Sequence, residues 1–368
     1  MESEVRAAVE KCLGIGLTFA AFRKPGEPVT IWAQRTPDLE VVDGALLWEL
    51  NDVFLLVPFD HDPKRIPFIR SDVELTFTTI SPDVTLLTEC RGRPRTDPST
   101  VSSTAKSSFT QVVDQVKRIM AAGGLEKVVL SRLEFHPIEP TMLPDLFLSA
   151  IHEMEHTMVA MVHTPTHGTW LGASPERLVV EDDDHVWVDA MAGTMTAGTA
   201  PMVADHWGAK ERHEQELVSR HVREVLERLD LANITDHGPG VVKAGGVAHL
   251  VTTFEADLND KPLSDLVLAL HPTPAVCGTP MEAAREFIRA HGTHERSLYA
   301  GCWGPWKPDG RTDLYVNIRC LQAVEGGVAI HVGAGITYES DPEAEWQETA
   351  HKSRVWLDMI QRSRAVPD

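Results

Sequence analysis

Hydrophobic residues before position 100 gather in short runs that Pro and Gly interrupt. Gly16–Phe22, Val29–Gln34 and Val53–Pro58 each have the length and composition of a β-strand. Arg91–Ser103 is rich in Arg, Pro, Ser and Thr, which is typical of a surface connection. We therefore expect a strand-rich N-terminal part that ends in an irregular segment.

Helical spacing of apolar residues follows this connection, beginning at Ser103 and ending at Gly123. Farther on, strands and single helices are mixed without a fixed repeat. This arrangement favours an α+β fold with large antiparallel sheets over a regular βαβ alternation. Strands are predicted at Lys127–Leu133, Met158–Val162, Val186–Ala190, Leu298–Trp303, Leu314–Leu321 and Val328–Val332, and helices at Leu143–Glu155, Lys210–Leu229 and Glu343–Ile360.

Charge and composition exclude several classes of protein. The 368 residues include 34 Lys and Arg against 54 Asp and Glu, a net charge of −20, which argues against nucleic-acid or anionic-membrane partners. No apolar run is long enough for a transmembrane helix, and the acidic start Met1–Glu4 is unlike a signal peptide. Five scattered cysteines without a Cys-x-x-Cys pair favour a reducing cytoplasm. An anionic ligand would need local positive charge at its site.

The segment His152–His156 (HEMEH) matches the H-E-x-x-H pattern of zinc proteases. In that pattern two His lie one helical turn apart and a Glu acts as base, and Glu176 is a conceivable third ligand here. However, His156 falls where the helix ends and a strand begins. We favour a solvated helix end over a zinc site, and the metalloprotease remains an alternative.

Two pairs of glutamates share the same spacing on two predicted helices. Glu211 and Glu214 lie near the start of one helix, and Glu345 and Glu348 near the start of the C-terminal one. Each pair occupies one helix face. If both faced one point, they would form an all-oxygen site of the kind that Mg²⁺ prefers. The alternative is acids that only complement the helix dipoles.

Three further features are candidates for a binding pocket. Ala192–Thr194 (AGT) and Gly333–Gly335 (GAG) lie at strand ends, where Gly lets a ligand approach main-chain N–H groups. Lys127 begins an apolar strand, so partial desolvation could lower its pKa and make it a base. Ordinary turns and a lysine that extends to solvent are the respective alternatives.

Nine segments carry recognisable patterns along the chain: Lys127–Arg132 (KVVLSR), Gly172–Glu176 (GASPE), Ala192–Thr194, Lys210–Val218 (KERHEQELV), His249-Leu250, Leu270–Pro280 (LHPTPAVCGTP), Tyr299–Gly304 (YAGCWG), Ile318-Arg319 and Gly333–Lys352. Taken in this order, they resemble the chorismate-utilising enzymes, which include isochorismate, salicylate, anthranilate and aminodeoxychorismate synthases. The resemblance implies a single large domain over residues 1–368, with a variable part over 1–100 and the catalytic part over 105–362. It also implies two large antiparallel sheets packed face to face with helices outside.

Three positions point to a subgroup. Lys127 is typical of family members that add water to the ring, Ala192 replaces the nucleophilic Lys of aminodeoxychorismate synthases, and Ala275 replaces the Thr of salicylate and anthranilate synthases. The resemblance therefore implies conversion of chorismate to isochorismate. Cys277 and the bulky stretch Cys302–Trp306 depart from the family pattern.

The resemblance also implies residue roles. Lys127 would deprotonate the water that enters at ring C2, and Glu176 would protonate the C4 hydroxyl that leaves. Mg²⁺ on Glu214 and Glu348, with Glu211 and Glu345 as further or water-mediated partners, would receive the ring carboxylate. The enolpyruvyl carboxylate and the ring would be bound by Arg319, Lys352, Tyr299, Gly333, Gly335, Gly193, Thr194, His249 and Ala275.

The expected partner is chorismate alone, without a glutaminase subunit, and the expected state is a monomer. The product would feed siderophore, menaquinone or salicylate synthesis. A salicylate synthase, which also eliminates pyruvate, is the nearest alternative. A homologue that binds without catalysis is a more distant one.

Overall fold

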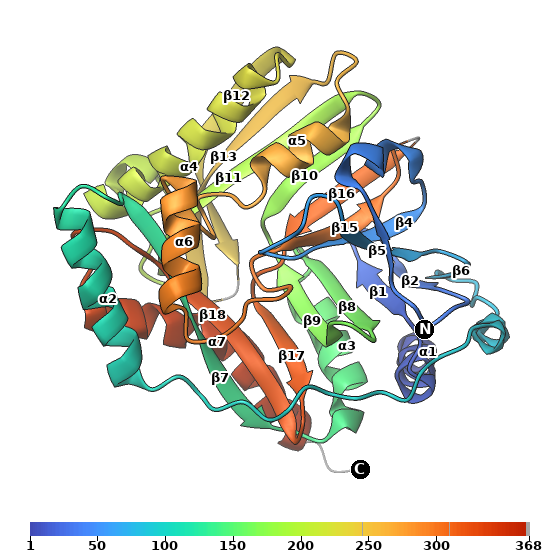
Figure 1. Cartoon of the computed structure of the whole chain (residues 1–368). Coiled ribbons are helices and arrows are strands. Elements are labelled where there is room, and N and C mark those ends of the chain that lie inside the picture. Colours follow the sequence, from blue (N-terminus) through green and yellow to red (C-terminus); the bar gives the residue numbers. More distant parts are fainter. Residues whose placement is uncertain (245, 309, 366–368) are drawn as a thin grey trace.

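Two large antiparallel sheets form the framework of the molecule (Figure 1). The computed structural model describes residues 1–244, 246–308 and 310–365. The main hydrophobic core contains side chains from both sheets, among them Trp170 of the first and Phe254 of the second. The predicted fold, an α+β domain with two large antiparallel sheets packed face to face, is therefore confirmed.

The first sheet contains most of the strands that sequence patterns predicted. Its order is β14-β7-β18-β17-β9-β8-β1-β2-β6, and every pairing is antiparallel. Strand β18 thus lies between β7 and β17, although about 190 residues separate it from β7 along the chain. The strands are β1 Phe19–Arg23, β2 Val29–Ala33, β6 Val73–Phe77, β7 Lys127–Pro137, β8 Met158–Thr164, β9 Gly168–Ser174, β14 Gly278–Thr279, β17 Cys320–Val324 and β18 Gly327–Ile336.

The second sheet has the order β12-β13-β11-β10-β16-β15-β4-β5-β3, also antiparallel throughout. N-terminal strands form one end of each sheet, which Figure 1 shows in blue. The strands are β3 Glu40–Val42, β4 Val53–Val57, β5 Ile66–Arg70, β10 Arg177–Asp182, β11 His185–Thr196, β12 Ala232–Ala244, β13 Val247–Asp257, β15 Cys302–Trp306 and β16 Arg311–Val316.

Helices cover the sheets in two groups. Helices α1, α3 and α7 bury apolar faces on the outer side of the first sheet, whereas α2, α4, α5 and α6 contribute to the core that both sheets share. The helices are α1 Glu2–Ile15, α2 Lys106–Ala121, α3 Leu143–Glu153, α4 Ala209–Arg228, α5 Leu263–Leu270, α6 Met281–His291 and α7 Pro342–Ala365. Short 3₁₀ helices lie at Gly44–Glu49, Val84–Glu89, Pro140–Met142 and Ala204–His206.

One predicted strand is wrong in a way that matters for function. The apolar run Leu314–Leu321 was expected to be continuous, but β16 ends at Val316 and β17 begins at Cys320 in the other sheet. Arg319, between them, has a positive φ of 49°, a conformation that costs energy in a residue with a side chain. The predicted strand Leu298–Trp303 likewise begins only at Cys302. Apolar periodicity cannot detect a chain that crosses between sheets within a hydrophobic run.

Other sequence predictions agree more closely with the structure. The connection over residues 91–103 has no regular secondary structure. The five cysteines are free and buried. Among the described residues, no helix combines the length and apolar character that crossing a membrane requires.

Candidate active site

A pocket with about 730 Å³ of empty space opens between the first sheet, β11, β13 and helices α4 and α7. A concave pocket on which a few polar groups converge is where a small molecule typically binds. Its lining residues are Lys127, Val129, Glu176, Met191, Ala192, Gly193, Thr194, Glu214, His249, Ala275, Val276, Tyr299, Ile318, Arg319, His331, Val332, Gly333, Gly335, Glu348 and Lys352. The sequence had nominated most of these positions from widely separated segments.

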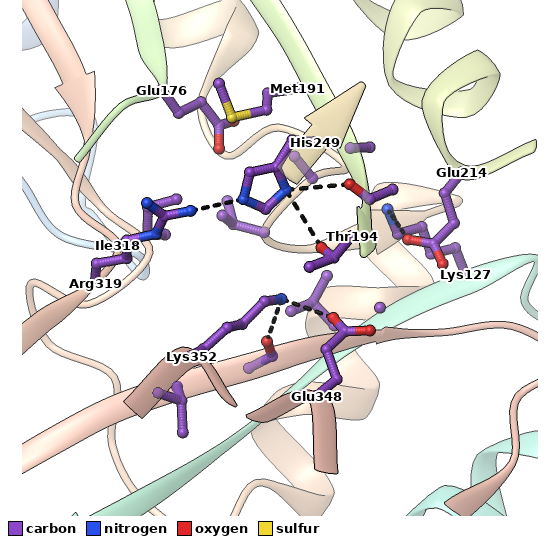
Figure 2. A pocket seen from close by; sticks show the side chains of 18 of the residues that line it. Lys127, Glu176, Met191, Thr194, Glu214, His249, Ile318, Arg319, Glu348 and Lys352 are labelled. Atoms are coloured by element: carbon purple, nitrogen blue, oxygen red, sulfur yellow. Dashed lines mark hydrogen bonds and ion pairs between the residues drawn. The ribbon is translucent and has the colours of Figure 1, made fainter. Parts of the chain in front are cut away.

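Lys127 begins strand β7 and points its ammonium into the pocket (Figure 2). Its side chain is 2% exposed, and Nζ lies 3.4 Å from Oε2 of Glu214 on α4. Gly335 of β18 makes room for this pair, since a Cβ there would lie 2.7 Å from Glu214 Oε2 and 2.9 Å from Lys127 Cε. A Cβ at this position would therefore displace the ends of two functional side chains.

Glu176 follows β9 and lies across the pocket from Lys127 (Figure 2). It is buried, and its Oε1 has no hydrogen-bond partner among the described residues. Burial, aided by the charge of Asp189, raises the pKa of Glu176 to about 8, against the opposing influence of Lys127 and Arg319. The carboxyl group is thus mainly protonated at neutral pH and can donate a proton.

His249 on β13 orients the guanidinium of Arg319. Arg319 donates a hydrogen bond of 2.7 Å to His249 Nε2, while His249 Nδ1 lies 3.1 Å from the Gly193 carbonyl oxygen and 3.3 Å from Thr194 Oγ1. Burial, with the charges of Arg319 and Lys352, lowers the pKa of His249 well below its usual value. A neutral ring protonated at Nδ1 satisfies both contacts.

The AGT segment forms a β-bulge. The pairing of β11 with β13 shifts register between Ala192 and Thr194, and Gly193 has a φ of 68°. A Cβ at Gly193 would also lie 2.9 Å from the main-chain oxygen of Glu211. The motif therefore turns Thr194 into the pocket and lets helix α4 pack closely.

Lys352 of α7 adds a further cation to the pocket. Its Nζ donates to the Gly333 carbonyl oxygen at 2.9 Å and to Glu348 Oε1 at 2.8 Å. The hydroxyl group of Tyr299 lies over Gly333, where a Cβ would be 2.5 Å away. Together with Arg319, Lys352 supplies the local positive charge that an anionic ligand needs in a protein with a net charge of −20.

Three of the four predicted acids, Glu214, Glu345 and Glu348, lie around a lysine that the sequence did not nominate. Lys210 Nζ lies 2.5 Å from Glu345 Oε1 and 3.8 Å from Glu214 Oε1. Although burial lowers the pKa of Lys210, the charges of Glu345, Glu214 and Glu348 outweigh it and raise the pKa. The starts of α4 and α7 thus form a cluster of carboxylates around one ammonium group.

Two predicted metal-site residues do not line the pocket. Glu345 is 1% exposed and lies behind it, paired with Lys210, and its Oε2 has no hydrogen-bond partner among the described residues. Glu211 folds its carboxylate over Gly208 at the N-terminus of α4, as the helix-dipole alternative predicts. The other predicted residues come together in one place.

The H-E-x-x-H segment lies outside this pocket. Helix α3 ends at Glu153, so His152 and His156 do not share a helical face, and His152 is paired at 3.1 Å with Glu2. Over residues 1–244, 246–308 and 310–365, no three His, Cys, Asp or Glu side chains are grouped as a ready metal cage. The zinc alternative therefore has no structural support.

Sequence reasoning missed several pocket residues, chiefly apolar ones and His331. His331 lies two residues before Gly333, on the same face of β18, so strand alternation could have nominated it. The two departures from the family pattern lie outside the lining: Cys277 is fully buried beside Val276, and Cys302 and Trp303 belong to the core strand β15. The missed apolar residues are Val129, Met191, Val276, Ile318 and Val332.

Known proteins share both the sequence and the fold of this chain. Isochorismate synthase DhbC of Bacillus subtilis is 33% identical over 260 residues, which cover 67% of this chain and 65%, just under two thirds, of DhbC. Isochorismate synthase EntC of Escherichia coli is 30% identical over 69% of this chain and 67% of EntC. Anthranilate synthase component 1 of Streptomyces coelicolor is 31% identical over 71% of this chain and 53% of its own length.

Two solved structures have the same fold. DhbC from Bacillus anthracis aligns with a TM-score of 0.75 at 24% identity, covering 96% of this chain and 99% of DhbC. MenF, the menaquinone-specific isochorismate synthase of Escherichia coli, aligns with a TM-score of 0.79 at 21% identity over 97% of this chain and 91% of MenF. The family described as chorismate binding enzyme matches residues 70–361. The chain therefore belongs to the chorismate-binding enzyme family.

Proposed function

We propose that this protein is an isochorismate synthase, which converts chorismate to isochorismate by adding water at ring C2 and releasing the C4 hydroxyl. The observation that carries the proposal is the placement of Lys127 and Glu176 on opposite sides of one pocket (Figure 2). Such an exchange needs a base and an acid at two separated ring positions. Similar proteins named isochorismate synthase support this assignment.

In the proposed reaction, Lys127 acts as the base that takes a proton from water as the new C2–O bond forms. The ring double bonds shift, the C4–O bond breaks, and Glu176 gives its proton to the departing hydroxyl, which leaves as water. One water is consumed and one released, and the two side chains return to their starting states through solvent. The pKa of Glu176, raised to about 8, keeps the required proton in place at neutral pH.

The acidic cluster fits a divalent cation. Its donors are hard carboxylate oxygens, Glu345 Oε2 is buried without a partner among the described residues, and the cluster already attracts the ammonium of Lys210. Mg²⁺ uses one or two carboxylates and keeps several waters, so a ready cage is unnecessary. Glu214 and Glu348 would hold it, with Glu211 and Glu345 acting through water. When bound, the ion would neutralise the ring carboxylate of the substrate.

The remaining residues would orient the dianion. Arg319, held by His249, and Lys352 would bind the enolpyruvyl carboxylate through charge-assisted hydrogen bonds. Tyr299 and the N–H groups near Gly333 and Gly335 would complete this end. Thr194, Gly193, His249 and Ala275 would line the ring.

The experiment is incubation of purified protein with chorismate and Mg²⁺, with products resolved by chromatography and an EDTA control. We expect isochorismate alone, lost in EDTA. Lys127→Ala should lose at least about 100-fold in kcat while keeping its circular dichroism spectrum, because a general base contributes at least that much. Salicylate with pyruvate would contradict the subgroup, and substantial turnover by Lys127→Ala would contradict its role.

We also propose a cytoplasmic monomer that needs no glutaminase subunit. The free, buried cysteines support a reducing compartment. The isochorismate would feed siderophore, menaquinone or salicylate synthesis.

A further inference from the structure

Strand β18 forms one wall of the pocket with three residues on the same face, His331, Gly333 and Gly335. Gly335 faces Lys127 and Glu214, and Gly333 faces the Tyr299 hydroxyl group. Gly335 lies four positions after His331 along the strand, a span of about 13 Å. His331 therefore lies at the end of this wall that is remote from the acidic cluster.

Arg319 lies at the same end of the pocket as His331. His331 pairs directly with Cys320 across β17 and β18, and Arg319 is the residue before Cys320. Both Arg319 and His331 line the pocket. A ligand whose ring carboxylate is held near Glu214 and Glu348 would thus extend its other end toward this pair.

Like Glu176 Oε1, the His331 ring is a polar group of the pocket that lacks a hydrogen-bond partner among the residues that the structure describes. The residue is 2% exposed, and neither Nδ1 nor Nε2 has a hydrogen-bond partner within the described part of the chain. Its neighbours are rings: Trp170 at 4.8 Å, Tyr299 at 5.3 Å and His294 at 5.4 Å between centroids. Buried polar groups are rarely left unpaired, so a ligand or water is expected to complete this one.

We propose that His331 is a substrate-positioning residue that donates a ring N–H to the enolpyruvyl group of chorismate, beside Arg319. This inference rests on the proposed function. A neutral imidazole suits the role because it donates a directional hydrogen bond without adding to the charge already supplied by Arg319. It would hold the enolpyruvyl group in one orientation while chemistry proceeds at the ring.

The test compares His331→Phe, His331→Gln and His331→Asn in two measurements. The first is steady-state kinetics with chorismate, with 4-hydroxybenzoate as a competitive probe that has the ring carboxylate but no enolpyruvyl group. The second is calorimetric binding of chorismate with Mg²⁺ in a Lys127→Ala background, which separates binding from turnover. His163→Phe is the matched control, because His163 is buried on β8 of the same sheet, outside the pocket, and hydrogen-bonded to Thr169.

We expect His331→Phe to raise KM and the calorimetric Kd for chorismate roughly tenfold, the loss of one buried hydrogen bond. The Ki of 4-hydroxybenzoate should stay unchanged, Gln or Asn should restore most of the affinity, and His163→Phe should have wild-type KM. Unchanged chorismate affinity in His331→Phe would overturn the proposal. Equal weakening of chorismate and 4-hydroxybenzoate would also overturn it, since it would indicate only a packing role.

The calorimetric arm separates this inference from the proposed function. If the wild type turned over no chorismate but the Lys127→Ala protein bound it in a His331-dependent way, the reaction assigned above would be wrong and the positioning role would stand. Absence of any chorismate binding would overturn both.

Discussion

Replacement of Glu176 by Gln should make the protein more stable at alkaline pH. Glu176 is buried with one carboxyl oxygen unpartnered among the described residues, and burial raises its pKa from 4.5 to about 8. Gln is the neutral isostere of the protonated acid. The variant therefore retains the favoured protonation state and can never acquire the buried charge.

The magnitude follows from linkage between protonation and folding. Below pH 4.5 the folded and unfolded states both bind the proton, and the contribution of Glu176 is fully present. Between pH 4.5 and 8 the folded state holds a proton that the unfolded state has lost, so stability falls as pH rises, by about 1.4 kcal/mol per unit. With a folded pKa of about 8, wild type should lose about 4 kcal/mol relative to Glu176→Gln between pH 5 and pH 9.

Urea denaturation of both proteins at pH 5, 7 and 9, without substrate or metal, gives this difference directly, because groups that titrate alike in both proteins cancel. The stabilities should be similar at pH 5 and diverge progressively to pH 9, with Glu176→Gln the more stable. A stability difference that stays constant from pH 5 to pH 9 would refute a raised pKa for Glu176. A wild type that becomes more stable relative to Glu176→Gln as pH rises would instead indicate a lowered pKa.

Three other predictions follow from the pocket. The kcat of wild type should fall about tenfold per pH unit above the Glu176 pKa of about 8, as the proton donor is lost, and a pH–rate profile that stays flat to pH 9.5 would contradict this. Lys210→Met removes the ammonium that lies 2.5 Å from Glu345 and should lower the free energy of unfolding in urea by about 2–3 kcal/mol, less than for a fully buried pair because Lys210 is 27% exposed. Added Mg²⁺ should restore part of this lost stability. Unchanged stability would show that the ion pair contributes little. Gly335→Ala introduces a Cβ 2.7 Å from Glu214 Oε2, so calorimetry should show at least roughly tenfold weaker Mg²⁺ binding, whereas Gly14→Ala, at a helical position in α1 with open space, should bind Mg²⁺ normally.

The mixture of strand and helix patterns along the sequence predicted large antiparallel sheets. The resemblance to a known family predicted most of the pocket lining. Helix α4 is recognisable because its apolar residues recur at helical spacing, and strand β7 because the continuous apolar run Val128–Leu130 lies near its start. The crossing at residues 317–319 was not recognisable, because Val316 and Cys320 are both buried and only the backbone reveals that they belong to different sheets. Helix α1 was missed although its signal is present, because the buried residues Val5, Ala8, Val9, Cys12 and Leu13 recur at helical spacing.

The acidic cluster shows where sequence reasoning stops. Spacing predicted that Glu211 and Glu214 share a helix face, but not that Glu211 folds back over Gly208. Spacing also could not predict the role of Lys210, because that role depends on the start of α7 lying beside the start of α4. Such contacts depend on tertiary placement of two helices that are more than 100 residues apart in the chain.

The central place of β18 has a consequence for biosynthesis. Strand β7 is complete by residue 137, but its partner β18 spans residues 327–336, and Lys352 follows later still. While the ribosome is adding the residues between them, the β18-facing edge of β7 has no partner, and an unpaired strand edge is a template for aggregation. A nascent chain therefore cannot acquire its pocket gradually, and a truncated chain that lacks β18 should depend on chaperones and be removed by proteases.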